Sequence, residues 1–587
     1  MSGSFRLIRG QRGVVLATAL ALAVVATMLG ATPAPAATPC TTPPPTVPQA
    51  QLTPGTIGNG VTALGGTSPR PFDFRVIDTI PNGWMIGLDA VVIQITGPSS
   101  FLDETGGVFF GMSGSPAYVG GRLAGAVSGV FYDDPTFGLL TPADAMVDIV
   151  EAAGSSPRAS IAREIAPTDR VRRSIALASG VSPAQVTGSF QQLPVPLGVS
   201  GMSPSQITAL QQRMDERGEN FWIYSAGAAP AQVGEVQAIP FGPGQPLGVA
   251  VSTGDASYYA TGTATFVCGD YVAAFGHPFF YDAPGEISLG LSGAKGLMIL
   301  KGSSYPGSRF ALLTEARGQI VQDRFAGIVG VVGVAPPSVP ITSDLVNLDT
   351  GSSRVGTTEA IHTWGYWLQE IVWSHMSGNF VGVFQHLGAG SSQLGWTVEG
   401  MTESGQAFTV TNGAMVSSQW DATESLWSLV STIDQLQFNR FEEVTFTGIS
   451  ATGSITKQRL EGDIVRVRVS SPLQPALKER GVVRARPGQV VTIEVTLDPL
   501  EDGPDVVTTL SVRVPRGAQG VEQVKLSGGR GLRYVDAGSF EDLVAALNGG
   551  DAENDLLVKA FGAKAAHPQD LIVNGKGGFQ IQVVRNR

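Results

Sequence analysis

The sequence predicts a mainly β protein built from several domains. Its 75 glycines and 38 prolines among 587 residues, with only 7% aromatic residues, are typical of short strands joined by turns. Strict alternation of apolar and polar residues at 464–469 and 490–495 indicates strands directly, because successive side chains of a strand point to opposite faces. The length exceeds what one hydrophobic core supports, so we expect about three or four domains.

The first 36 residues are typical of a cleavable signal peptide. Arg6, Arg9 and Arg12 precede an uncharged apolar run at 14–29, and Ala34-Pro35-Ala36 has the small-x-small form of a signal-peptidase site. A membrane anchor is the alternative, but it would need a longer apolar run. We therefore expect a secreted or otherwise extracytoplasmic protein of the cell envelope, with no stable membrane anchor once the signal is cleaved.

Residues 37–55 are rich in Thr and Pro and predict a stiff, solvated leader. The chain has two cysteines, Cys40 in this leader and Cys268 far along the sequence. In an exported protein these two residues can form one disulfide, but 228 positions of separation leave their distance in space open.

Charge and residue spacing restrict the partners. The net charge is −11, and loss of three arginines with residues 1–36 would move it to −14. An acidic chain argues against nucleic acid and against anionic membranes as partners. Two cysteines and five scattered histidines show no metal-ligand spacing, so neither a metal nor another cofactor is expected. The oligomeric state is left open.

The run GMSGSP at residues 111–116 is the strongest chemical signal. A nucleophilic serine has to be lifted out of its sheet, with backbone N–H groups free beside it for a developing oxyanion. Glycines on both sides of Ser113 permit that backbone shape and leave room for a substrate carbonyl. A Gly/Ser turn without chemistry is the alternative interpretation.

His277 is the best candidate for a general base. It lies in a Gly-His-Pro turn after an apolar strand, where an imidazole can be presented at the edge of a sheet. Histidine is the side chain best suited to take a proton from serine near neutral pH. The alternative is a histidine that only braces the turn. The remaining histidines have weaker contexts: His362, His375, His386 and His567.

These motifs divide the chain into predicted units. Residues 56–154 form a β half that carries Ser113, and residues 155–235 a mixed insert with a helix starting at Ser203-Pro204. A second β half with His277 covers 236–440. Residues 441–587 are expected to form a sandwich-like β-domain with one helix capped by Ser539.

The two motifs together resemble the SpoIVB peptidase family, named for stage IV sporulation protein B. The run at 111–116, with Thr105-Gly106-Gly107 before it and residues 125–127 and 134–136 after it, resembles the family's serine segment. The stretch 262–266, leading to Phe275-Gly276-His277, resembles its histidine segment. The resemblance covers about residues 60–340.

The resemblance implies serine endopeptidase chemistry on a trypsin-like double β-barrel, with a protein or peptide as substrate. Ser113 would be the nucleophile and His277 the general base. The backbone N–H groups of Gly111 and Ser113 would form the oxyanion hole. Ser115 is the competing serine, ranked second because the residue before a proline is conformationally restricted.

Two features depart from the family pattern. The histidine follows the serine along this chain, so the halves of the double barrel would be permuted; triads tolerate different chain orders because they are defined by geometry. The family's aspartate is also missing, since Thr96-Gly97-Pro98 occupies its place. Asp282 is the possible third member, with Asp255 and Asp103 as further candidates. Whether residues 155–235 hold a diverged PDZ-like module is left open.

These departures favour a second possible function, namely that of a non-catalytic cell-surface or secreted binding protein that retains the peptidase-like fold. Its C-terminal β-domain would then be the recognition part, since fold resemblance does not guarantee chemistry. Esterase activity is a third, remote hypothesis. Its nucleophile elbow would need glycine where Ser115 stands and a helix where a hairpin is predicted.

Overall fold

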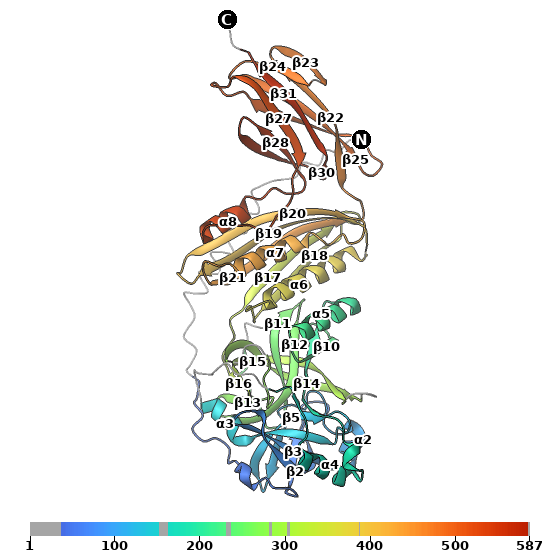
Figure 1. Cartoon of the computed structure of the whole chain (residues 1–587), viewed down its shortest axis with the longest axis vertical. Helices are drawn as coiled ribbons and strands as arrows, with labels where there is room; N and C mark the ends of the chain where they lie inside the picture. Colours follow the sequence, from blue (N-terminus) through green and yellow to red (C-terminus); the bar gives the residue numbers. More distant parts are fainter. Residues whose placement is uncertain are drawn as a thin grey trace.

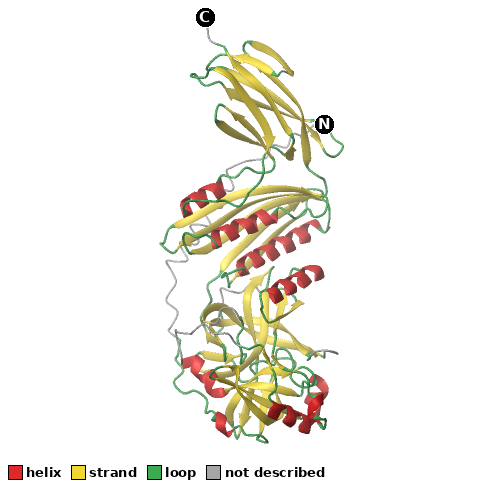
Figure 2. Cartoon of the chain, in the orientation of Figure 1, coloured by secondary structure: helices red, strands yellow, loops and turns green. Residues whose placement is uncertain are grey.

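The computed structural model describes residues 37–151, 162–229, 236–280, 285–301, 306–386, 388–479 and 481–584. The predicted signal peptide at 1–36 lies outside these residues. The fold is mainly β, as predicted. Its elements follow one another along the long axis of the molecule, from the blue and cyan elements at the bottom of Figure 1 to the red ones at the top. Helices cover one side of the middle layer (Figure 2).

Six strands close into a barrel around the serine motif. In hydrogen-bonding order these strands are β4 (Pro116–Val119), β1 (Ile57–Thr62), β2 (Arg70–Met85), β3 (Leu88–Gly97), β6 (Phe137–Pro142) and β5 (Arg122–Phe131), and β5 pairs with β4 again. Helix α2 (Ser99–Thr105) follows β3, and α3 (Ala143–Glu151) follows β6.

The interior of this barrel follows from the two-residue period of its strands. Phe72, Phe74 and Val76 of β2 are completely buried, whereas their neighbours Asp73 and Arg75 are exposed. Burial of one large apolar side chain contributes about 1.5–3 kcal/mol relative to leaving it in water. A one-residue slip of β2 would turn these rings outward, so the alternation holds the register of the barrel.

The strands around His277 pair in a second closed cycle. In order they are β12 (Tyr258–Cys268), β13 (Tyr271–Ala274), β16 (Gly327–Val332), β15 (Ser308–Arg324), β14 (Gly285–Leu300) and β11 (Pro246–Gly254), and β11 pairs with β12 again. His277 follows the end of β13. Figure 1 shows these green strands directly above the first barrel.

The strands of the predicted insert extend the sheets of both cycles. Strands β7 (Glu164–Ile165) and β8 (Phe190–Gln192) extend the first sheet beside β5. Strands β9 (Val195–Val199) and β10 (Phe221–Ser225) extend the second beside β12. Its helical parts are listed here in chain order: α4 (Asp169–Ser179), η2 (Pro183–Gln185) and α5 (Pro204–Glu216). Ser203 caps α5 through a bond from the Gln206 amide, which confirms the predicted helix start.

A five-stranded layer with helices on it follows along the chain. Its order is β18 (Ser353–Ala360), β17 (Val339–Asn347), β21 (Val444–Thr456), β19 (Gly390–Thr402) and β20 (Ala407–Ser418), and β18 joins it to β11. Helices α6 (Trp367–Phe384) and α7 (Leu426–Gln437) lie together on one face of this layer, as Figure 2 shows. None of the helices in the described part of the chain combines the length and apolarity needed to cross a bilayer.

The C-terminal part consists of two further sheets that share one apolar core. One sheet contains β23 (Gln474–Glu479), β22 (Glu461–Ser471), β25 (Val490–Pro499), β26 (Val506–Arg513) and β30 (Ile572–Asn574). The other contains β24 (Val482–Ala485), β31 (Lys576–Val583), β27 (Gly520–Gly528), β28 (Asp555–Ala560) and β29 (Ala563–Pro568). Ser539 caps α8 (Phe540–Asn548), as predicted. The predicted boundary at 441 precedes β21, which pairs with β17 and β19, so these two sheets begin at β22.

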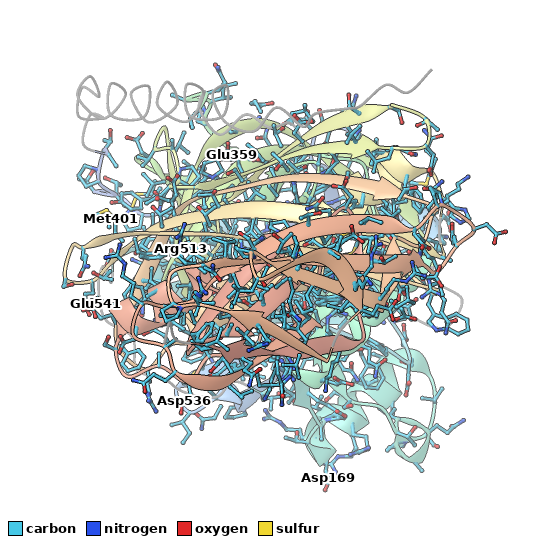
Figure 3. All side chains as sticks on the ribbon, turned by 90° about the horizontal axis from the view of Figure 1, so that it is seen from above. Asp169, Glu359, Met401, Arg513, Asp536 and Glu541 are labelled. Atoms are coloured by element: carbon cyan, nitrogen blue, oxygen red, sulfur yellow. A yellow bond between two sulfur atoms is a disulfide. The ribbon has the colours of Figure 1, made fainter. Side chains whose placement is uncertain are left out.

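Charged side chains occupy the outside of the stack. Viewed from above in Figure 3, Asp169 and Glu541 lie at the margin of the molecule, and both are exposed. Several charged side chains are buried instead, among them Arg309 and Asp323 of the second strand cycle, and these need a physical explanation.

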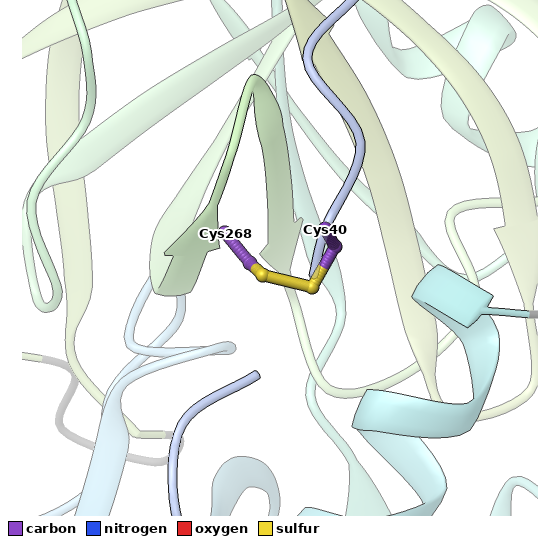
Figure 4. The surroundings of a disulfide bond; sticks show 2 residues. All are labelled: Cys40 and Cys268. Atoms are coloured by element: carbon purple, nitrogen blue, oxygen red, sulfur yellow. A yellow bond between two sulfur atoms is a disulfide. The ribbon is translucent and has the colours of Figure 1, made fainter. Parts of the chain in front are cut away.

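The leader is attached to both strand cycles. Cys40 and Cys268 form a disulfide with 4.9 Å between their Cα atoms, which places the leader against the β12–β13 hairpin (Figure 4). The Thr38 amide donates to the Asp270 carboxylate of the same hairpin at 2.6 Å, and the Asp270 amide donates back to Thr38 O at 3.0 Å. The open question of cysteine pairing is therefore answered.

Further along, the leader binds the first barrel. The Val47 amide donates to Leu123 O at 2.8 Å, and the Leu123 amide donates to Pro45 O at 2.9 Å. Val47 and Leu52 are buried in the barrel core, and the 3-10 turn η1 (Gln49–Gln51) lies between them. The prediction of a solvated leader is wrong for this part, because its apolar side chains complete the core of the barrel.

We expect reduction of the Cys40–Cys268 disulfide to lower the free energy of unfolding by about 2–4 kcal/mol, since the crosslink restricts the unfolded chain over a long loop. Urea unfolding with and without dithiothreitol measures this change. A Cys40→Ser/Cys268→Ser double variant is the control and should not respond to the reductant. An unchanged urea midpoint after complete reduction, verified by thiol titration, would contradict the expectation.

Candidate active site

The serine motif forms a tight loop between α2 and β4. Gly111 has φ 94° and Gly114 has φ 88°, conformations that side-chain-bearing residues rarely adopt. A Cβ atom at Gly114 would collide with the backbone of Thr263 and of Phe275. Glycine on either side of Ser113 is therefore required, and the loop lies directly against the histidine-bearing strands.

The backbone N–H groups of this loop fall into two sets. The amides of Met112, Gly114 and Ser115 donate to Phe109 O, Val127 O and Met112 O at 2.8–3.0 Å. Within the described residues, no acceptor is found for the amides of Gly111 and Ser113. These two N–H groups are the ones that the sequence analysis assigns to an oxyanion hole.

Strand β12 holds the carbonyl groups of the loop. The Thr263 amide donates to Ser113 O at 2.9 Å, and Thr263 Oγ1 donates to Gly111 O at 3.0 Å. Thr265 Oγ1 donates to Gly114 O at 2.7 Å. These carbonyls belong to the peptide units that carry the amides of Met112, Gly114 and Ser115, so β12 fixes the orientation of the three bonded amides of the loop.

His277 lies in an equally tight turn at the end of β13. Phe275 and Gly276 both have φ 68°, and the imidazole is completely buried. Its Nδ1 atom lies 2.7 Å from Pro278 O. A carbonyl oxygen can only accept, so Nδ1 carries the proton, and in the neutral ring Nε2 keeps its lone pair. Burial lowers the pKa of His277 to about 4, which keeps the ring neutral at physiological pH.

The histidine turn contacts the serine loop at Gly114, beside the backbone of Phe275, and contacts strands β5 and β6 of the first barrel. Thr141 Oγ1 of β6 donates to Gly276 O at 2.6 Å, and Gly276 lies against the backbone of Val127. Ser113 Oγ and His277 Nε2 are both buried, and neither has a hydrogen-bond partner among the described residues. The expected serine–histidine hydrogen bond is therefore absent from this structure, although the two segments meet. Ser115 Oγ is likewise buried without a partner.

A buried carboxylate that the sequence analysis missed holds the turn after His277. Asp323 of β15 accepts the amides of Phe279 at 2.8 Å and of Phe280 at 2.7 Å. Burial raises the pKa of Asp323 to about 8, against the opposing effect of these two amides. Its signal in the sequence is an acidic residue two positions before the apolar stretch Phe325-Ala326-Gly327.

None of the three acids named from the sequence is seen to contact the imidazole. Asp282 lies outside the described residues. Asp255 pairs with Arg354 at 3.2 Å and accepts the Thr357 amide at 2.9 Å, whereas Asp103 is exposed on α2. The partner of the imidazole Nδ1–H is instead the Pro278 carbonyl, which no motif search would single out.

A second serine–histidine pair lies inside the helical layer. His375 Nε2 is 2.9 Å from Ser343 Oγ, and Nδ1 is 2.9 Å from Thr358 Oγ1, which also accepts the Ala256 amide. Both ring nitrogens of His375 are therefore engaged by hydroxyl groups of the sheet on which α6 lies.

No metal site emerges from the described ranges, where no three His, Cys, Asp or Glu side chains converge. His362 stacks on Phe280 at 4.9 Å between ring centroids and supports the segment held by Asp323.

Comparison with known protein families gives a match for one segment of the chain. Residues 49–147 match the family model described as SpoIVB peptidase S55, which confirms the resemblance seen in the sequence. This segment includes almost all of the first barrel and Ser113, but not His277. No curated protein and no solved structure matches the chain.

The raised pKa of Asp323 predicts a pH dependence of stability. Between about pH 4 and pH 8 the folded protein holds a proton on Asp323 that the unfolded chain releases, so this contribution to stability falls as pH rises through that window. Wild type should lose up to about 1.4 kcal/mol per pH unit relative to an Asp323→Asn variant. Urea unfolding of both proteins from pH 5 to pH 8 measures the difference, and parallel curves would contradict it.

Proposed function

We propose, from the membership of residues 49–147 in the SpoIVB peptidase S55 family, that this chain is a serine endopeptidase acting on protein substrates. Ser113 is the nucleophile, and His277 is the general base. The observation that carries the proposal is the pair of amides at Gly111 and Ser113, which have no acceptor within the described residues and flank a buried serine hydroxyl.

The chemistry uses these groups in sequence. Ser113 Oγ attacks the scissile carbonyl carbon while His277 Nε2 takes the hydroxyl proton. The carbonyl oxygen gains negative charge and accepts from the Gly111 and Ser113 amides. The imidazolium then gives its proton to the leaving amine, and water hydrolyses the acyl-enzyme with His277 again as base.

The Pro278 carbonyl replaces the aspartate of a triad in one of its two roles. It selects the tautomer in which Nε2 is unprotonated, which is what an orienting carboxylate does. A neutral carbonyl stabilises the imidazolium less than a carboxylate would. We therefore assign the chain a Ser–His dyad, with Asp323 holding the two amides that follow Pro278.

Substrate access requires an opening motion, since Ser113 and His277 are both completely buried. The same motion would have to bring Ser113 Oγ and His277 Nε2 into contact, because neither atom has a hydrogen-bond partner among the described residues. Catalytic hydrogen bonds are often long without substrate and tighten only in the complex.

The family and the strand pairings together support a permuted trypsin-like arrangement. The serine-bearing barrel comes first in the chain, and the second six-strand cycle supplies the histidine. The two C-terminal sheets form a sandwich-like domain outside this catalytic unit. Export to the cell envelope by the segment at 1–36 fits a family that is secreted or membrane-associated.

A non-catalytic binding protein is the second candidate function. Full burial of Ser113 and the unmade serine–histidine bond favour it. The same burial is also what a closed, substrate-free peptidase would show, so activity measurements separate the two.

Replacement of the nucleophile tests the proposal. Ser113→Ala should lower the rate of casein cleavage by at least about 10³-fold, because the attacking oxygen is removed. Ser115→Ala is the matched control, since that hydroxyl is equally buried and unpartnered, and it should retain activity. Wild-type cleavage by Ser113→Ala would refute the assignment, and loss only in Ser115→Ala would move the nucleophile to Ser115.

The acidic limb of the pH profile of kcat/KM should lie at an unusually low pH. With the pKa of His277 lowered to about 4, the free enzyme keeps an unprotonated base down to that pH. We expect kcat/KM to fall only below about pH 4 to 5, rather than near 6.5 where an ordinary imidazole titrates. A limb near pH 6.5 would contradict the burial of the base in the free enzyme.

A further inference from the structure

We propose that Arg309, on β15, is a positioning residue of the oxyanion loop that holds a positive charge beneath Gly111. This inference rests on the proposed function. Arg309 is one of the largest completely buried side chains of the protein, and none of the ion pairs in the described ranges involves it.

The backbone of Arg309 is attached to the serine loop. Its amide donates to Phe110 O at 2.9 Å, and the Phe110 amide donates to Gly307 O at 2.7 Å. Phe110 is the residue directly before Gly111. The N-terminal end of β15 therefore pairs with Phe110, directly before the serine loop. Displacement of this end of β15 would also displace the loop.

The guanidinium group is close to Gly111. A Cβ atom at Gly111 would lie 3.3 Å from Arg309 Cβ, 3.5 Å from Nε and 3.7 Å from Cζ. Glycine at this position leaves the arginine against the main chain whose amide is a proposed oxyanion donor. Any larger residue would push the charge away.

The hydrogen bonds of Arg309 go to neutral acceptors on both sides of the loop. Its Nη1 donates to Ala63 O at 2.9 Å, and its Nη2 donates to Gly262 O at 2.6 Å. Nη2 also donates to Thr263 Oγ1 at 3.4 Å, and that hydroxyl donates onward to Gly111 O. Arg309 thus holds Thr263, which in turn holds the carbonyls of Gly111 and Ser113.

Among the described residues no carboxylate pairs with Arg309, which distinguishes it from an ordinary structural arginine. Burial lowers its pKa to about 10, so it is still protonated at neutral pH. The ionisable group that interacts with it is Tyr224 of β10, whose pKa burial raises well above its ordinary value, so it stays neutral. Arg309 Nε has no acceptor within the described residues.

A buried cation without a carboxylate is unfavourable in the resting protein, because charge is poorly solvated by a low-dielectric interior. The same environment strengthens its attraction for negative charge that forms nearby. The tetrahedral intermediate places such a charge at the amides of Gly111 and Ser113. Arg309 therefore favours the transition state over the ground state, which is the condition for raising kcat rather than binding.

The test compares labelling of full-length protein by a fluorophosphonate probe, which reports formation of the tetrahedral adduct at the nucleophile. Wild type should be labelled and Ser113→Ala should not. Arg309→Met should be labelled about 10²-fold more slowly, comparable to loss of one oxyanion donor. Arg354→Met is the matched control, because that arginine pairs with Asp255 and Asn379 away from the loop, and it should match wild type.

Arg309→Lys supplies a readout that a merely structural role would not change. A buried lysine has a lowered pKa, so its labelling rate should fall as pH rises above neutrality while wild type stays constant. This variant also decides the question if Arg309→Met fails to fold, as judged by near-ultraviolet circular dichroism.

The outcomes separate the two proposals. Absence of labelling in wild type overturns both the peptidase assignment and this inference. Labelling of wild type that is abolished in Ser113→Ala, with Arg309→Met unchanged, overturns the role of Arg309 and leaves the peptidase assignment intact. A pH profile of Arg309→Lys parallel to that of wild type likewise overturns the role of its charge.

Discussion

The close backbone contact between the serine loop and β12 is the constraint on which the site depends. Gly114 lies so near Thr263 and Phe275 that no side chain fits between them, and three loop carbonyls accept from Thr263 and Thr265. This contact joins two six-strand cycles that are separate in sequence. It also fixes the peptide units that carry the amides of Met112, Gly114 and Ser115, which leaves the amides of Gly111 and Ser113 as the unbonded pair among the described residues.

The interior of the site keeps polar groups that folding alone would not favour. A buried donor or acceptor without a partner costs about 1–3 kcal/mol, and Ser113 Oγ, Ser115 Oγ and His277 Nε2 are all in this state. Arg309 adds a buried charge bonded only to neutral groups. Stability is supplied elsewhere, by the apolar interiors of both strand cycles and by the leader that is crosslinked to one and paired with the other. Unsatisfied groups gathered at one contact are typical of functional sites.

Local patterns in the sequence were sufficient for the elements and for the serine motif. Alternation predicted β22 and β25, the Ser-Pro pair predicted α5, and glycines at 111 and 114 do adopt the backbone conformations that a raised serine needs. The partners of the site come from long-range packing, which leaves no local pattern. Thr141 illustrates the limit, because its hydroxyl donates to Gly276 O beside the histidine, 135 positions further along the chain. Asp323 and Arg309 escaped notice for the same reason, since nothing next to them in the chain reveals what they bind.

The absence of the family's aspartate can be understood from the two tasks that the acid of a catalytic triad performs. An orienting acid must hold the imidazole in one tautomer and stabilise the cation formed in the reaction. The Pro278 carbonyl performs the first task, because an oxygen that only accepts forces the proton onto Nδ1. The second task is weakened, and a buried imidazole with a pKa near 4 is a poor resting proton acceptor. In the proposed mechanism, a substrate that brings its developing negative charge next to the ring would raise that pKa within the complex, so that His277 would become a strong base only when substrate is present.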